Sequence, residues 1–182
     1  MFIRIKKIKN KEYAYLVKNI WRKRKKASRQ TTKRYLGKVH KVEKTTNVSL
    51  KDFLKINNLE KYLNENKPEK IIKNLIQTEL SNHEFKEVQK DVWILNSIKL
   101  NLKEKTIINE KTKKPLCLEI NNNFLCNPTL KKLLKFKPKA ELTELQIGKG
   151  LANSFESAGI LIPKDIFVVI AQKILKDKKN NQ

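Results

Sequence analysis

The side chains best suited to chemistry in this sequence are the cations of its first 44 residues. These residues hold 17 Lys or Arg against two acids, Glu12 and Glu43, so they contribute +15 to a formal net charge of +24. Lysine and arginine bind phosphate oxygens, and each phosphate that they neutralise releases condensed counterions. We therefore expect nucleic acid as the partner, ahead of an anionic membrane surface or an acidic protein tail.

The arginines are confined to the same region. All five lie between Arg4 and Arg34, although lysine is far more common along the chain. Arginine presents a planar fork of five donors that lysine lacks, so the region is predicted to use guanidinium groups specifically; chance codon use is the alternative. The predicted contact residues are these cations and three rings: Arg4, Lys6, Lys7, Tyr13, Tyr15, Trp21, Arg22, Lys23, Arg24, Lys25, Lys26, Arg29, Lys33 and Arg34.

Alternation of side chains predicts that the region is a ribbon of strands. Phe2, Arg4 and Lys6 would share one face, and Tyr13, Tyr15 and Val17 one face of the next strand. A basic loop at 22–27 would bind phosphates, and a third strand would run over 29–35. The rings have two interpretations, stacking on bases or covering the ribbon's own small core.

The remaining residues predict an α+β body. Apolar residues at helical spacing, together with capping residues, predict a helix over 50–63, one beginning at Pro68, a short one over 128–134 and one over 140–157. Strand patterns fill 85–126 and predict a small second sheet. Gly159 and Pro163 predict a stop and a restart, hence a C-terminal helical hairpin that ends in a polar tail from Lys176. This hairpin is expected to pack internally or to dock a protein partner.

One part of the chain resembles a known family. Three stretches carry the resemblance: Phe2-Ile3-Arg4-Ile5-Lys6-Lys7, Tyr13-Ala14-Tyr15-Leu16-Val17-Lys18, and Arg29-Gln30 with Tyr35-Leu36-Gly37-Lys38. They resemble the N-terminal meander of insertion-sequence transposases of the acidic-triad type, and of assorted archaeal proteins. The resemblance implies nucleic-acid contact and no particular reaction. Together with the Lys and Asn bias, it indicates an archaeal source.

Signatures of catalysis are weak. A transposase-type metal site needs three well-separated carboxylates, the first usually an Asp on a strand. Of the four Asp in the chain, only Asp91, before Val92, could open a strand, so no triad is predicted. Cys117 and Cys126, with His40 and His83, show no zinc-ligand spacing, and we expect reduced, half-buried thiols. No enzyme activity, metal or cofactor is predicted.

The resulting prediction is an α+β protein of two parts, a contact meander over 1–44 and a body over 45–182. The expected function is non-enzymatic binding of structured RNA, in the manner of ribosome-associated proteins, or of duplex DNA. No apolar run reaches the length of about 18 residues that a membrane span needs, so we expect a cytoplasmic protein. Two alternatives are an adaptor that uses the C-terminal hairpin, and a transposase relic that binds DNA without cleaving it.

Overall fold

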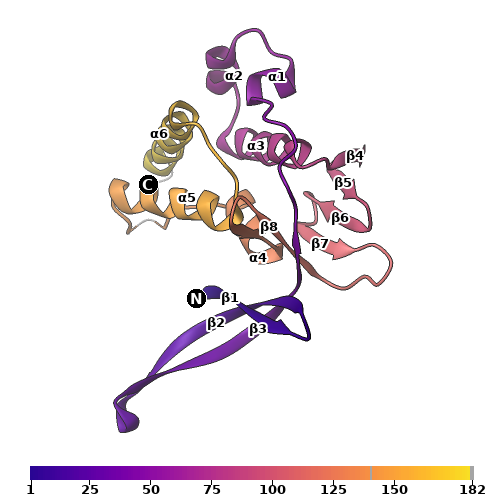
Figure 1. Cartoon of the computed structure of the whole chain (residues 1–182). Helices are drawn as coiled ribbons and strands as arrows, with labels where there is room; N and C mark the ends of the chain where they lie inside the picture. Colours follow the sequence, from indigo (N-terminus) through magenta and orange to yellow (C-terminus); the bar gives the residue numbers. More distant parts are fainter. Residues whose placement is uncertain (140, 181–182) are drawn as a thin grey trace.

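The computed structural model describes residues 1–139 and 141–180. Both helices and strands are present, and the protein is α+β as the sequence predicts. Figure 1 shows an N-terminal ribbon whose long hairpin projects away from a body of helices and short strands. The strands form a five-stranded sheet in the order β1-β2-β3-β8-β9 and a four-stranded sheet in the order β4-β5-β6-β7.

The predicted N-terminal meander is confirmed. Strand β1 (Phe2–Ile8) pairs antiparallel with β2 (Lys11–Arg22), and β2 pairs antiparallel with β3 (Ala27–Lys41). The first turn lies at Lys9-Asn10. Both of its residues have positive φ, which is typical of the turn type that matches strand twist. A short 3-10 helix, η1 (Lys23–Lys25), closes the second hairpin within the predicted basic loop.

Strand β3 extends well beyond the predicted end at residue 35. Two β-bulges interrupt its pairing with β2, next to Tyr15 and next to Val17, and extra residues at bulges bend and twist a strand. After Gly37, β3 pairs in parallel with β8 (Leu116–Ile120), which pairs with β9 (Asn123–Leu125). The prediction that residues 85–126 form one separate sheet is therefore wrong for their last two strands, which complete the N-terminal sheet.

The second sheet is a meander of four short strands. It consists of β4 (Lys86–Gln89), β5 (Val92–Leu95), β6 (Ile98–Asn101) and β7 (Thr106–Asn109), all paired antiparallel. Asp91 lies in the turn directly before β5 and is not itself part of the strand. It has a φ of 69° in the turn before β5, where its carboxylate lies 2.5 Å from the ammonium of Lys73.

Three helices link the two sheets along the chain. The predicted helix over 50–63 is broken, because Lys55 adopts a left-handed conformation after α1 (Leu50–Leu54) and Asn58 caps α2 (Leu59–Glu65). Helix α3 (Pro68–Asn82) begins at the predicted proline, whose missing N–H is not needed in a first turn. Its buried stripe includes Ile71, Ile72, Leu75 and Ile76.

The chain ends in three helices, α4 (Asn127–Leu134), α5 (Glu144–Ala158) and α6 (Lys164–Asn180). Helix α5 begins later than predicted, at a capping box of Thr143 and Gln146; Ala140, its predicted start, lies outside the described residues. Gly159 forms the predicted left-handed stop with a φ of 68°. The Lys178 ammonium near the end of α6 donates to the Leu142 carbonyl before α5 (2.7 Å), so the two helices form the predicted hairpin.

The polar tail predicted from Lys176 is helical as far as Asn180, while residues 181–182 lie outside the described part of the chain.

Two apolar clusters stabilise this arrangement. The larger one packs α3, α4, α5 and α6 against both sheets, and its most buried side chains include Ile76, Leu118 and Phe155. The smaller one lies on one face of the meander, with Ala14, Leu36, Val39, Cys117 and Cys126 at its centre. Because Cys126 is the residue before α4, the start of that helix packs against this face.

Candidate nucleic-acid interface

The meander has two faces of different chemistry. Strand register places Arg4 opposite Tyr15 and Lys6 opposite Tyr13, with Tyr35 opposite Tyr15 on the third strand. Opposed residues in a sheet project from the same side. We call this set the tyrosine face, and its grouping of cations with rings is as the sequence predicts.

The tyrosine rings pack on one another. The centroid of Tyr35 lies 5.5 Å from that of Tyr15 and 6.4 Å from that of Tyr13, and the Lys6 ammonium lies 5.0 Å from the centroid of Tyr15. Burial, followed by the neighbouring Tyr15 and Tyr13, raises the pKa of Tyr35 above its usual 10.0. These contacts favour the packing interpretation for Tyr13 and Tyr15. Trp21, in contrast, is 62% exposed near the tip of the hairpin.

The second face carries most of the arginines. Arg34 lies opposite Leu16, Arg29 opposite Ile20 and Arg22 opposite Ala27, so all three project from the side that is opposite to the tyrosines. We call Lys18, Arg22, Arg29 and Arg34 the arginine face. Nearer the body, the same side of the sheet is covered by the smaller apolar cluster, against which Leu16 packs.

The predicted contact residues are therefore divided in space. Arg4, Lys6, Tyr13, Tyr15 and Trp21 lie on the side of the tyrosine face, whereas Lys7 lies on the other side, opposite Glu12. Lys23, Arg24 and Lys26 are exposed at the hairpin tip. Lys25 is the last residue of η1. Lys33 is exposed at the β-bulge next to Val17. The predicted contact residues thus lie on both sides of the hairpin and at its tip.

Few of these cations have partners. The Arg4 guanidinium donates to the Gln30 side-chain oxygen, and the Gln30 amide donates to Asn19 at 3.5 Å. Within the described residues, the ion pairs of the N-terminal 44 residues are limited to Lys44 with Glu79, at 3.9 Å. The positive charge of the hairpin is thus not neutralised by neighbouring carboxylates.

A basic groove that the sequence reasoning missed adjoins the arginine face. It has a volume of about 660 Å³ and lies between Arg34 of β3, the turn after β6 and helix α4. Its other basic residues are Lys105, Lys131, Lys132, Lys135 and Lys137. The one local signal was the acid-free run of lysines from 131 to 139. Local patterns could not have placed this run beside Arg34.

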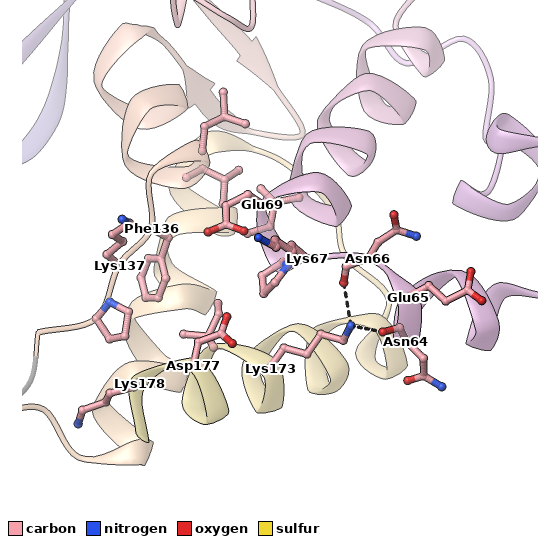
Figure 2. A pocket seen from close by; sticks show the side chains of 16 residues that line it. Asn64, Glu65, Asn66, Lys67, Glu69, Phe136, Lys137, Lys173, Asp177 and Lys178 are labelled. Carbon is pink, nitrogen blue, oxygen red and sulfur yellow. Dashed lines mark hydrogen bonds between the residues drawn. The ribbon is translucent and has the colours of Figure 1, made fainter. Parts of the chain in front are cut away.

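Another cavity, of about 650 Å³, opens between α2, α3, α4 and α6 (Figure 2). The Lys173 ammonium donates to the backbone carbonyls of Asn64 (2.8 Å) and Asn66 (2.7 Å) at the end of α2. Figure 2 shows this side chain crossing the cavity floor towards the α2–α3 link. Lys173 therefore joins α6 to the end of another helix, where cations are stabilised by the exposed carbonyls.

The buried polar side chains of the body are engaged in structural contacts. Glu79 accepts from the Asn121 amide at 2.6 Å, and the His83 ring nitrogen Nδ1 lies 2.8 Å from the Glu79 carbonyl. The Asn82 side chain bonds both the N–H and the carbonyl of Val48, which fixes the link between β3 and α1. These contacts explain why such polar groups are tolerated inside the body.

The two cysteines are free thiols, and both are fully buried, not half-buried as the sequence suggested. Cys117 pairs with Val39 in the parallel strands, and Cys126 precedes α4. A hydrogen bond with Cys126 and burial raise the pKa of Cys117 well above its usual value. The parallel pairing of β3 with β8 thus places Cys117 in the core beneath the meander.

Within residues 1–139 and 141–180, no group of three or more His, Cys, Asp or Glu side chains is arranged to hold a metal ion. In the same part of the chain, no helix has the length and apolarity that crossing a membrane requires.

No protein-family model, no curated protein and no solved structure matches the chain. The resemblance of the meander to transposase N-terminal modules therefore stays a prediction.

Proposed function

We propose that this protein binds nucleic acid through its projecting β2–β3 hairpin, contacting the phosphate backbone of structured RNA or duplex DNA without catalysing a reaction. The observation that supports this most is the hairpin itself. It extends beyond the body (Figure 1), and its exposed arginines and lysines form no ion pair within the described residues. Cations that are paired with carboxylates bind phosphate less readily, whereas the cations of the hairpin remain available to it.

The division into two faces suggests how the hairpin is used. Arginine and lysine side chains bind phosphates and fix the position of the protein, but they carry little sequence information. The tyrosine face adds rings that are largely packed on each other, so base reading is not its main role. We therefore propose backbone recognition, with RNA slightly favoured over DNA as the target class.

A triple substitution tests the proposal. Arg22, Arg24 and Arg29 are all exposed, so replacing them with Ala should leave the fold intact. Losing three phosphate contacts should reduce the slope of log affinity against log salt by about 2 to 3 for duplex DNA. The measurement is fluorescence anisotropy with one duplex sequence, made as RNA and as DNA. Equal slopes for the wild type and the variant would contradict the proposal.

A matched variant separates charge from geometry. Replacing the same three arginines with Lys keeps the charge but removes the planar fork. If guanidinium geometry matters, this variant binds more weakly than the wild type at every salt concentration. Unchanged binding would show that positive charge alone suffices.

Cleavage is tested in the same preparation. Incubation of supercoiled DNA with Mg²⁺ or Mn²⁺ should give no nicking above that of a blank. Nicking that depends on the metal would contradict the non-enzymatic proposal and support the transposase interpretation.

A second candidate function is that of an adaptor. Leu161, between α5 and α6, is 55% exposed, and Val168 on α6 is 42% exposed. Leu161 also lines a shallow pocket of about 420 Å³ with Phe155, Ile160 and Phe167. Crosslinking of the tagged protein in its own cells discriminates the two candidates. Enrichment of one RNA or DNA class supports nucleic-acid binding, whereas recovery of neither favours the adaptor.

A further inference from the structure

We infer that the groove along helix α4 is a second phosphate-binding surface, and that a bound nucleic-acid backbone passes into it from the arginine face of the hairpin. This inference rests on the proposed function and assigns a role to residues of the body. It concerns six cations from three separate segments: Arg34, Lys105, Lys131, Lys132, Lys135 and Lys137.

The charge of the groove is strongly one-sided. Glu104 is the single acidic residue among those that line it, and it lies at an exposed turn. Within the described residues, no ion pair involves any of the six cations. Six positive charges gathered around one concavity repel one another, and an anionic ligand relieves that repulsion. The groove therefore favours a polyanion.

The groove runs along the whole of α4. Asn127 and Pro128 begin the helix and line the groove, and so does Lys135, which follows its last turn. Eight residues of helix extend over about 12 Å, and one strand of a duplex presents a phosphate every 3.4 Å or so along its axis. Roughly three phosphates fit beside three lysines of this helix segment. An elongated backbone suits these dimensions better than a single small anion.

The groove and the arginine face lie on the same side of the meander. Arg34 projects with its partner Leu16, and Leu16 packs on the apolar cluster that contains Cys126, the residue before α4. From Leu16 to Arg22 the hairpin continues for six residues, which is about 20 Å at the usual rise of a strand. Arg34 is thus the junction between the cations of the hairpin and those of the groove.

The tyrosine face has no corresponding continuation. Its shallow pocket of about 470 Å³ is lined by Ile8, Tyr13, Tyr15 and Tyr35, none of which carries a positive charge. A phosphate backbone that crosses this face meets Arg4 and Lys6 and then packed rings. The arginine side therefore offers the longer uninterrupted path for phosphates.

The test is a groove variant, with Lys131, Lys132 and Lys135 all replaced by Ala. Its matched control replaces Lys51, Lys61 and Lys70, three exposed helical lysines of α1, α2 and α3, and removes the same charge. The probe is a duplex of about 20 base pairs, made as RNA and as DNA, and anisotropy is measured from about 50 to about 200 mM salt. The wild type and the Arg22, Arg24 and Arg29 variant are measured alongside.

If the groove binds phosphates, the slope of log affinity against log salt falls by about 2 to 3 for duplex DNA in the groove variant, and far less in the control. If the groove variant matches the control while the arginine variant loses slope, the groove inference is overturned and the proposed function stands. If the wild type binds neither duplex, both are overturned. A second variant with Gln at the same three positions replaces the first if its thermal unfolding shows a loss of folding.

Discussion

At the scale of single residues, Trp21 is the aromatic side chain best placed to contact a base. It is 62% exposed, whereas the other tryptophan, Trp93, is buried in the main core beside Phe53. Tyr13 and Tyr15 are occupied by contacts with Tyr35. Stacking between a base and an aromatic side chain contributes about 1 to 3 kcal/mol per base.

Fluorescence can isolate this ring. A Trp93→Phe variant leaves Trp21 as the one tryptophan, because the chain has two. We expect its emission to be quenched when single-stranded RNA is added. In the Trp21→Phe variant the remaining tryptophan emission comes from buried Trp93, and we expect it not to be quenched. An unchanged Trp21 signal at saturating RNA would mean that the ring does not stack.

His40 predicts a dependence of stability on pH. Its pKa is lowered, first by burial and then by the nearby Lys38, and its Nε2 atom is buried without a hydrogen-bond partner. The folded state therefore binds the proton less readily than the unfolded state, whose His pKa is about 6.5. The stability contributed by neutral His40 is complete above that pH and is lost as the pH falls below it, towards the folded-state pKa.

The measurement is urea unfolding of the wild type and a His40→Leu variant at about pH 5 and about pH 7.5. The free energy of unfolding of the wild type should fall more between these two pH values than that of the variant. If the free energy of unfolding changes equally with pH in the two proteins, His40 does not cause the pH dependence.

At the scale of elements, the link between the meander and the body depends on Gly37. Its φ is +130°, and a Cβ atom there would lie 2.6 Å from the carbonyl carbon of Pro115 and 2.7 Å from the Cα of Leu116. Leu116 is the first residue of β8, so the backbone of β3 approaches β8 too closely for a side chain. Glycine is required for both reasons, the close approach and the positive φ.

A pair of Gly→Ala variants tests this requirement. We expect Gly37→Ala to destabilise the protein by about 3 kcal/mol or more, since strain and overlap add. Gly148→Ala is the control, because nothing lies within 4 Å of a Cβ atom at that position in α5. It should stabilise the helix by about 0.5 to 1 kcal/mol. Equal thermal unfolding of both variants would contradict the account of the β3–β8 junction.

The elements that the sequence predicted well are those with local signals. Alternating side chains indicated the meander, Pro68 marked the start of α3, and Gly159 marked the end of α5. The prediction of a single helix over 50–63 was wrong because Lys55 adopts a left-handed conformation, which its residue type does not indicate. Propensity does not identify such a position when neighbouring contacts decide it.

The elements that the sequence could not predict depend on distant segments. The parallel pairing of Lys38–Lys41 with 116–119 joins strands that are far apart in the chain, and the residues around His40 do not look like a buried strand. The α4 groove is a consequence of that pairing, since the β8–β9 hairpin places α4 beside β3. Composition located the basic region but not its extension onto the body.

At the scale of the whole molecule, the projecting hairpin contributes little to the core. Residues 18–24 and 26–30 are all exposed, and both apolar clusters consist of residues outside this part of the hairpin. A segment with so little buried apolar area contributes little to the stability of the fold. Under the proposed function, the arginines and lysines of this segment contact phosphates of the bound nucleic acid.

The most direct test of the central claim is therefore a shortened hairpin, in which residues 18–31 are replaced by Asn-Gly between Val17 and Thr32. This two-residue turn suits a hairpin, so we expect thermal unfolding close to that of the wild type. The measurement is the affinity for duplex RNA and duplex DNA as a function of salt. The account predicts that a folded, shortened protein loses most of its affinity and much of its salt dependence. A shortened protein that binds as tightly as the wild type at every salt concentration would contradict it.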